Sequence, residues 1–271
     1  MHPYLGGWAR IAPDGQTVAL SARDGQARGV DIWLHDLARS STLKFTLGPG
    51  SGRFPVWSPD SSQLAFEMVT PESKDIYKKA TSGVSQMEIL SQTQEEHHVD
   101  DWSIDGRYIV EQRQDSKHGW DIWIVPMIGH EKAFPYLQSD ANETNARLSP
   151  NGQWLAYQSD ESKRNEIYVV GFPKQMQKFP ISSGGGTVPV WSRDGQELYF
   201  LSADRQLMAV EISLGKTLNP HVPNKLFETR AVFYDVSNNG RFLMTVPSEQ
   251  SAPSSVPLTA VFNWHAGLKR P

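Results

Sequence analysis

The densest group of side chains that could do chemistry is the run His97-His98-Val99-Asp100-Asp101. Imidazole and carboxylate ligands suit zinc, iron or manganese, so the run raises the hypothesis of a metal site. The flanking residues are typical of an extended strand, in which adjacent side chains point to opposite faces. His97 and His98 therefore cannot both face one ion, and we expect no metal and no other cofactor here.

Nucleophilic catalysis has little support in the sequence. The chain has no cysteine, which excludes disulfides, thiolate metal sites and cysteine nucleophiles. It has no Gly-x-Ser-x-Gly elbow, and the glycine-rich runs 48–52 and 184–186 do not open a helix, so neither makes a phosphate loop. The sequence predicts no catalytic residue.

Composition narrows the class of protein. The 271 residues carry 26 Lys and Arg against 30 Asp and Glu, a net charge of −4, which argues against a nucleic-acid partner. No run approaches 18 apolar residues, so we expect no insertion into a membrane. The first residues have neither a basic nor an apolar segment, so no signal peptide is predicted.

A short repeat sets the expected fold. An apolar or aromatic residue and a serine precede a tight turn, and the serine column falls at positions 12 (as Ala), 58, 103, 149, 192 and 237. Each turn leads into alternating apolar residues, and in four copies a later strand opens with an acid, an isoleucine and an aromatic residue. Those acids are Asp31, Asp75, Asp121 and Glu166. Because they recur, we expect them to make a repeated structural hydrogen bond.

Four short strands per 40–45-residue repeat are typical of a propeller blade. The sequence therefore predicts an all-β, six-bladed propeller of four-stranded antiparallel blades in one domain, 1–271. The expected blades are 6–51, 52–97, 98–143, 144–186, 187–230, and 231–271 completed by 1–5. In the last blade, Leu258–Trp264 is expected to be the third strand and His2–Leu5 the closing outer strand.

The repeats resemble those of the TolB-type propeller family, whose blades carry a Trp-Ser-Pro-Asp-Gly turn and a later Asp-Ile-Tyr strand. The stretch Ser182–Phe200 and the ending Phe262–Leu268 are similar to the C-terminal propeller of acidobacterial-type Ser/Thr protein kinases. No kinase motif is present in the chain. The resemblance implies a bacterial protein, periplasmic or extracellular, although the sequence itself leaves the compartment open.

The candidate site lies where loops lead into the inner strand of each blade. Two residues before the serine, the column reads Arg10, Val56, Asp101, Arg147, Val190 and Asp235. It predicts two structural ion pairs between neighbouring blades, Asp101 with Arg147 and Asp235 with Arg10. Just upstream, the mouth loops add Glu143 and Thr187. As binding residues at the channel mouth and lining we predict Arg53, His98, Asp100, Asp101, Asn145, Arg147 and Arg230.

Three functions remain open. The first is a non-catalytic, monomeric sensor or interaction module that binds a protein segment or a small polar ligand at the channel mouth. The second is a hydrolase or lyase acting on a lactone, ester or glycan, with or without a metal, because propeller enzymes assemble sites from several blades. The third is a scaffold for protein assembly. We expect the first.

Overall fold

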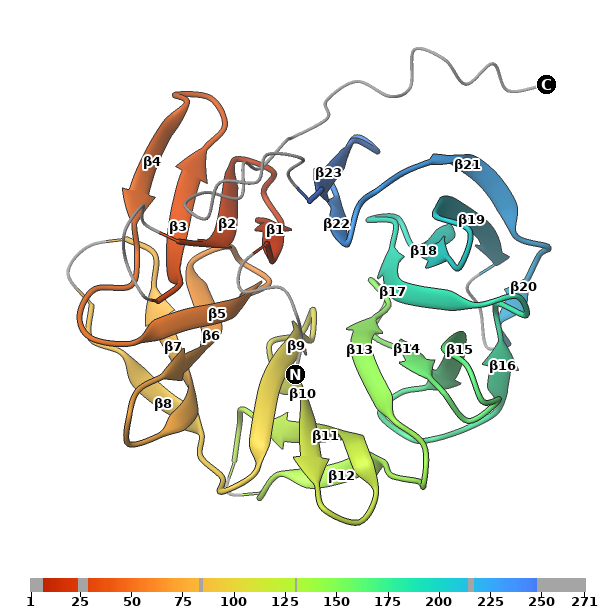
Figure 1. Cartoon of the computed structure of the whole chain (residues 1–271), viewed down its shortest axis with the longest axis horizontal. Coiled ribbons are helices and arrows are strands. Elements are labelled where there is room, and N and C mark those ends of the chain that lie inside the picture. Colours follow the sequence, from red (N-terminus) through yellow and green to blue (C-terminus); the bar gives the residue numbers. More distant parts are fainter. Residues whose placement is uncertain (1–6, 24–28, 83–84, 130, 214–216, 248–271) are drawn as a thin grey trace. The chain divides into compact units, whose positions relative to one another are not determined.

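The computed structural model describes residues 7–23, 29–82, 85–129, 131–213 and 217–247 (Figure 1). All regular structure in these segments is β-strand, from β1 (Ala9–Ile11) to β23 (Phe242–Thr245), which confirms the all-β prediction. No helix in the described segments is long and apolar enough to cross a bilayer.

The first of two compact units contains residues 1–92 and 230–271. Its described part holds two four-stranded antiparallel sheets, blades 1 and 2, and one two-stranded sheet, blade 6. Blade 1 is β1 (Ala9–Ile11), β2 (Thr17–Ala22), β3 (Asp31–Asp36) and β4 (Ser41–Lys44); blade 2 is β5 (Ser51–Trp57), β6 (Gln63–Val69), β7 (Lys74–Ala80) and β8 (Glu88–Ser91); blade 6 is β22 (Phe233–Val236) and β23 (Phe242–Thr245).

The second compact unit is Thr93–Thr229 and holds blades 3, 4 and 5. Blade 3 is β9 (Glu96–Trp102), β10 (Tyr108–Asp115), β11 (Gly119–Pro126) and β12 (Phe134–Leu137); blade 4 is β13 (Glu143–Leu148), β14 (Trp154–Ser159), β15 (Glu166–Gly171) and β16 (Lys178–Pro180); blade 5 is β17 (Gly186–Trp191), β18 (Glu197–Ser202), β19 (Gln206–Ser213), β20 (Asn219–Pro220) and β21 (Asn224–Glu228). In blade 5, β20 and β21 share the outer edge of β19.

The blade count differs from the prediction. The described residues form five blades rather than six: four are four-stranded, and in the fifth β20 and β21 share the outer position; the sixth repeat supplies only β22 and β23 among the described residues. That repeat lacks the acid–isoleucine–aromatic signature, and among the described strands only β22 pairs with β23. The strands predicted at Leu258–Trp264 and His2–Leu5 lie outside the described residues.

The repeat serine organises the turn between the first two strands of a blade. In blade 2 the Ser58 hydroxyl donates to Asp60 Oδ1 at 2.6 Å and accepts the Gln63 N–H at 2.9 Å. The hydrogen bond from Ser58 holds the pKa of Asp60 below its ordinary value. Blades 3 and 5 repeat both bonds at Ser103 and Ser192, and blade 4 uses Asn151 as the acceptor at Ser149. This local hydrogen bonding explains the serine column.

In blades 1 to 4, the recurring acid of the third strand accepts a hydrogen bond from a residue that follows the fourth strand. Asp31 accepts from Thr46 at 3.0 Å, Asp75 from Gln92 at 3.3 Å, and Asp121 from Gln138 at 2.9 Å. In blade 4, Glu166 accepts from the hydroxyl of Ser182. The expectation of a repeated structural hydrogen bond is confirmed.

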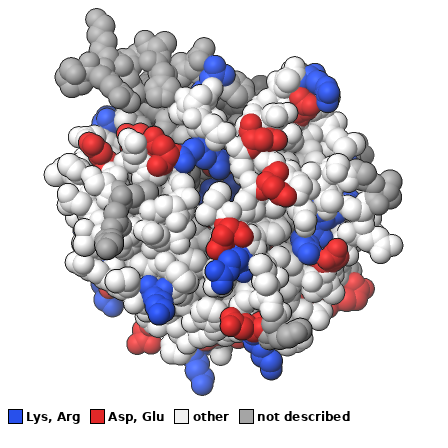
Figure 2. Space-filling model, turned by 180° about the vertical axis from the view of Figure 1, so that it is seen from behind, with Lys and Arg blue, Asp and Glu red and all other residues white. Residues whose placement is uncertain are grey.

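The apolar core of each unit lies between neighbouring blades. Ile32 of β3 packs in one cluster with Leu64 and Phe66 of β6, and all three side chains are fully buried. In the second unit, one cluster joins blades 3 and 4 and another joins blades 4 and 5. On the face that Figure 2 shows, Lys and Arg lie interspersed with Asp and Glu, so the near balance of charge in the sequence is kept locally.

Candidate functional site

The predicted charged column lies on the first strands of the blades. In the second unit, Asp101 Oδ2 accepts the N–H of Leu148 at 2.8 Å and lies 3.9 Å from Nε of Arg147. In the first unit, Asp235 Oδ2 accepts the N–H of Ile11 at 2.8 Å. Each aspartate thus binds the backbone of the next blade, one residue beyond the arginine that the sequence paired with it. The hydrogen bonds to the backbone fix the register of neighbouring blades.

Two tryptophans complete the same register. Trp57 donates its indole N–H to the carbonyl of Arg10 at 3.0 Å, and Trp191 donates to the carbonyl of Arg147 at 3.0 Å. Each unit therefore contains one aspartate contact followed by one tryptophan contact. The third residue of the column in each unit is a valine, Val56 or Val190. The column thus repeats every three blades, as Asp, Arg and Val, and these contacts, two in each unit, give that repeat a physical cause.

In several blades a β-bulge interrupts the first strand, close to the end at which the chain enters the blade. In blades 2, 4 and 5 two residues oppose one residue of the second strand, and the first of the two has a positive φ: Phe54 (53°), Asn145 (54°) and Val188 (53°). A positive φ is strained for Phe and Val, and such strain is concentrated at functional sites. Bulges also redirect side chains. They make this end of the first strands the candidate site.

In the second unit, buried polar side chains of blade 3 satisfy the bulge of blade 4. Asp100 accepts the N–H of Ala146 at 2.9 Å, and Gln112 accepts the N–H of Asn145 at 3.4 Å. Asp100 is itself buried. Unpaired buried N–H groups are costly, so Asp100 has a structural reason to be present. In blades 2 and 5 the position equivalent to Ala146 is a proline, which has no N–H.

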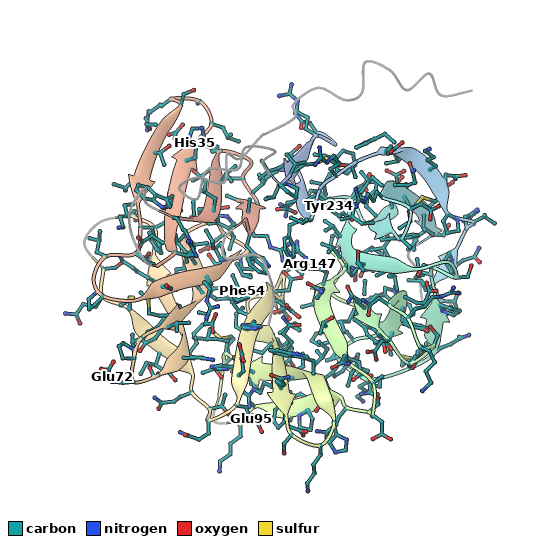
Figure 3. The ribbon with its side chains drawn as sticks, viewed as in Figure 1. His35, Phe54, Glu72, Glu95, Arg147 and Tyr234 are labelled. Atoms are coloured by element: carbon teal, nitrogen blue, oxygen red, sulfur yellow. The ribbon has the colours of Figure 1, made fainter. Side chains whose placement is uncertain are left out.

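The predicted residue Asn145 is partly exposed on β13. Its side-chain amide lies 3.3 Å from Thr144 Oγ1 and 3.3 Å from Gln158 Oε1. Two residues on, Arg147, which Figure 3 labels, is also partly exposed. Asp101 on the neighbouring β9 is partly exposed as well. The structure therefore brings Asp101, Asn145 and Arg147 together on two adjacent first strands.

Arg53 forms an ion pair within blade 2. Its Nε lies 3.1 Å from Oε2 of the fully buried Glu67, and its guanidinium lies 5.9 Å from the ring centroid of Phe54. The pair holds β5 against β6. Arg230 is exposed and precedes β22 in the same unit. The predicted set of binding residues is thus divided: Arg53 and Arg230 belong to the first unit, the others to the second.

The two histidines that raised the metal hypothesis have different partners. His97 lies 3.4 Å from Glu111 Oε2, which also accepts from Arg113 Nε at 3.0 Å, whereas the ring of His98 stacks on Trp120 with centroids 5.0 Å apart. Both histidines are buried. The expected divergence of adjacent side chains is confirmed. Within the part of the chain that the structure describes, no three His, Asp or Glu side chains are grouped to hold a metal.

Sequence reasoning missed an aromatic cluster in the first unit. Trp8 contacts Phe54 with ring centroids 4.2 Å apart and Phe233 with centroids 4.5 Å apart. All three occupy the position four residues before the repeat serine column, so the signal was present in the alignment of the repeats. In the second unit the same column reads Val99, Asn145 and Val188.

The chain is similar to known propellers. The sequence profile of the TolB beta propeller domain matches residues 3–178. No curated protein matches the chain.

Three solved structures show the fold. The putative TolB from Agrobacterium tumefaciens is 17% identical with a TM-score of 0.67, and the match covers 88% of each chain. TolB from Acinetobacter baumannii is 15% identical with a TM-score of 0.63, and the match covers 81% of this chain and 54% of that one. An oligogalacturonate lyase in complex with manganese is 13% identical with a TM-score of 0.60, covering 89% and 70%.

The profile match spans more than half of the sequence, and four of the six described sheets are antiparallel four-stranded blades. The chain therefore belongs to the TolB beta propeller domain family.

Proposed function

We propose that the chain is a non-catalytic module that binds a protein segment or a small polar ligand on the first strands of the blades, at the predicted channel mouth and lining. The TolB-type propeller fold supports a binding or interaction module. Six blades, a kinase-linked setting and a monomeric state remain predictions of the sequence within this proposal.

The observation that carries the proposal is the group Asp101, Asn145 and Arg147 in the second unit. The three polar side chains are partly exposed on two adjacent strands, and the strained φ of 54° at Asn145 sets the direction of one of them. An arginine beside a carboxylate and an amide can engage carboxylate, amide or hydroxyl groups of a ligand.

The test is a thermal-shift screen of the purified chain against peptides, sugars, lactones and divalent ions, paired with metal analysis. We expect a peptide or small polar ligand to raise the melting temperature, and Arg147→Ala to abolish that shift. Arg193→Ala is the control, because Arg193 is also a partly exposed arginine but lies in the turn after β17, outside the predicted set of binding residues.

Two results would overturn the proposal. Stoichiometric metal that is lost in His98→Ala or Asp100→Ala, or turnover of an ester, lactone or glycan, would make the chain an enzyme; a solved structural neighbour is a lyase with manganese. No shift with any ligand would favour the scaffold.

A further inference from the structure

An open hollow of about 590 Å³ lies in the second unit, between two loops. One wall is residues 139–142, which link β12 to β13, and the other is the β14–β15 hairpin with Asp160, Glu161 and Lys163. The volume is within the range of small-molecule sites and far above the roughly 30 Å³ of one water molecule. It suits a side chain or a small organic molecule better than a bare ion.

Glu143 lies directly behind the first wall. Ser139, which lines the hollow, donates its hydroxyl to Glu143 Oε1 at 2.5 Å. Glu143 is 4% exposed, and its Oε2 has no hydrogen-bond partner among the described residues. A buried carboxylate oxygen without a donor is unfavourable, so the blade does not need this group for its own stability.

The repeats support that conclusion. Glu143 stands six residues before the repeat serine, where blades 2 and 5 have Gly52 and Gly186. A Cβ on Gly52 would meet Thr46 at 2.8 Å, and one on Gly186 would meet Ser182 at 2.6 Å. In blades 2 and 5 the neighbouring side chains therefore leave room only for glycine at this position, whereas blade 3 holds the buried His97 and blade 4 holds a long acidic side chain.

A second buried carboxyl, that of Asp121, lies near Glu143. Asp121 of β11 is 1% exposed, and its Oδ1 also has no hydrogen-bond partner among the described residues. Its charge is among those that act on Glu143. Two adjacent buried carboxyls repel each other when both are ionised, and a cation placed between or beside them removes that repulsion.

The other charges around the hollow are mostly acidic. Asp160 accepts two hydrogen bonds from Asn142, at 2.8 and 2.7 Å, and so fixes the two walls together. Glu161 pairs with Lys178 of β16 at 2.5 Å. Burial first, with Asp121 and Glu161 adding to it and Ser139 and Lys178 opposing it, raises the pKa of Glu143 to about 7.

We propose that this hollow binds the ammonium or guanidinium group of an organic cation, such as a lysine or arginine side chain of a partner, with Glu143 as the carboxylate that receives it. Because binding favours the ionised carboxylate, it releases a proton near neutral pH. The site lies apart from Arg147 and goes beyond the function proposed above.

The test is isothermal titration of the full chain with N-acetyl-arginine amide, N-acetyl-lysine amide and spermidine at pH 6 and pH 8. We expect affinity several-fold higher at pH 8 and, at pH 7, a heat that changes with the buffer because a proton is released. The neutral analogue N-acetyl-glutamine amide should not bind. Spermidine against the amino-acid amides distinguishes a free polyamine from a partner's side chain.

Variants locate the site. Glu143→Gln removes an unfavourable buried charge, so it should fold, and we expect a loss of affinity of at least tenfold. Asp121→Asn should weaken binding, whereas its counterpart Asp75→Asn in blade 2 should not. Arg147→Ala should leave the titration unchanged, so failure here and failure of the proposed function are distinguishable.

Three results would overturn the inference. They are binding of the glutamine analogue as tight as that of the arginine amide, unchanged binding in Glu143→Gln, and no binding of any cation at millimolar concentration. Tighter binding of calcium or magnesium chloride than of the organic cations would also overturn it, because the site would then be a metal site.

Discussion

The two compact units carry the same fastening pattern but different interiors. Each has an aspartate that binds the backbone of the next blade, then a tryptophan that binds the carbonyl of an arginine. The first unit fills the bulge-side ends of its first strands with rings, through Trp8 and its neighbours. The second unit places polar groups there, including the buried Asp100 and the partly exposed Asn145.

The difference between the two interiors indicates which unit can bind a ligand. The aspartate and tryptophan contacts do not depend on which side chains occupy the bulge-side ends of the first strands. Apolar packing can therefore stabilise one unit while the other keeps polar side chains at these ends. Apolar packing stabilises without offering hydrogen bonds to a ligand. Binding is therefore expected in the second unit, Thr93–Thr229.

The largest expected effect is a difference in the free energy of unfolding between a substitution in the aromatic interior of the first unit and one in the polar interior of the second. Trp8→Ala removes a buried ring with two aromatic contacts, and we expect the free energy of unfolding to fall by about 3–5 kcal/mol. Asn145→Gly, which keeps the positive φ at the equivalent position, should cost about 1 kcal/mol. Guanidinium denaturation followed by circular dichroism measures both. A loss in Trp8→Ala as small as about 1 kcal/mol would show that the aromatic cluster does not stabilise the first unit.

The next effect depends on pH. The pKa of Glu143 is raised from 4.5 to about 7, so between these values the folded chain holds a proton that the unfolded chain has released. The free energy of unfolding should therefore fall as pH rises from 4.5 to 7, by up to about 3 kcal/mol. Glu143→Gln should flatten this fall and be more stable than the wild type at pH 8. A parallel pH profile in the variant would refute the assignment.

The aspartates test whether the fastening is equivalent. Asp101→Ala and Asp235→Ala each leave one backbone N–H, of Leu148 or Ile11, without its acceptor. We expect losses of about 1–3 kcal/mol that agree between the two variants. Urea denaturation at pH 8 provides the comparison. A loss confined to one variant would mean that the two contacts are not equivalent.

The smallest effect concerns the indole contacts. Trp57→Phe and Trp191→Phe keep an aromatic ring but remove one N–H···O=C bond of 3.0 Å each. We expect about 1 kcal/mol for each substitution. Differential scanning calorimetry of both variants measures it. Unchanged melting temperatures would assign the register to packing alone.

Much of the fold could be predicted from the sequence because the repeat is local. The serine turn depends on bonds between residues at most five apart, such as Ser58 with Gln63, and its signature is therefore readable. The predicted sixth blade is not confirmed, because the described residues supply only β22 and β23 of it and the strands predicted to complete it lie outside them.

The candidate site was harder to predict. Aligning the repeats brought Asp101 and Arg147 together, but not the backbone N–H of Leu148 that the aspartate binds. The bulge residues gave no local signal, since Phe54 and Val188 are not residue types that favour a positive φ. Burial of Glu143 depends on two loops and a neighbouring blade, so spacing alone could not show it.

The central claim is that each unit is fastened by its own aspartate, and hydrogen exchange of Asp101→Ala measured by mass spectrometry tests it most directly. We predict faster amide exchange within 93–229, greatest near Leu148, and unchanged protection in 7–92 and 230–247, with Asp235→Ala giving the converse. Equal loss of protection in both units from either substitution would contradict the claim.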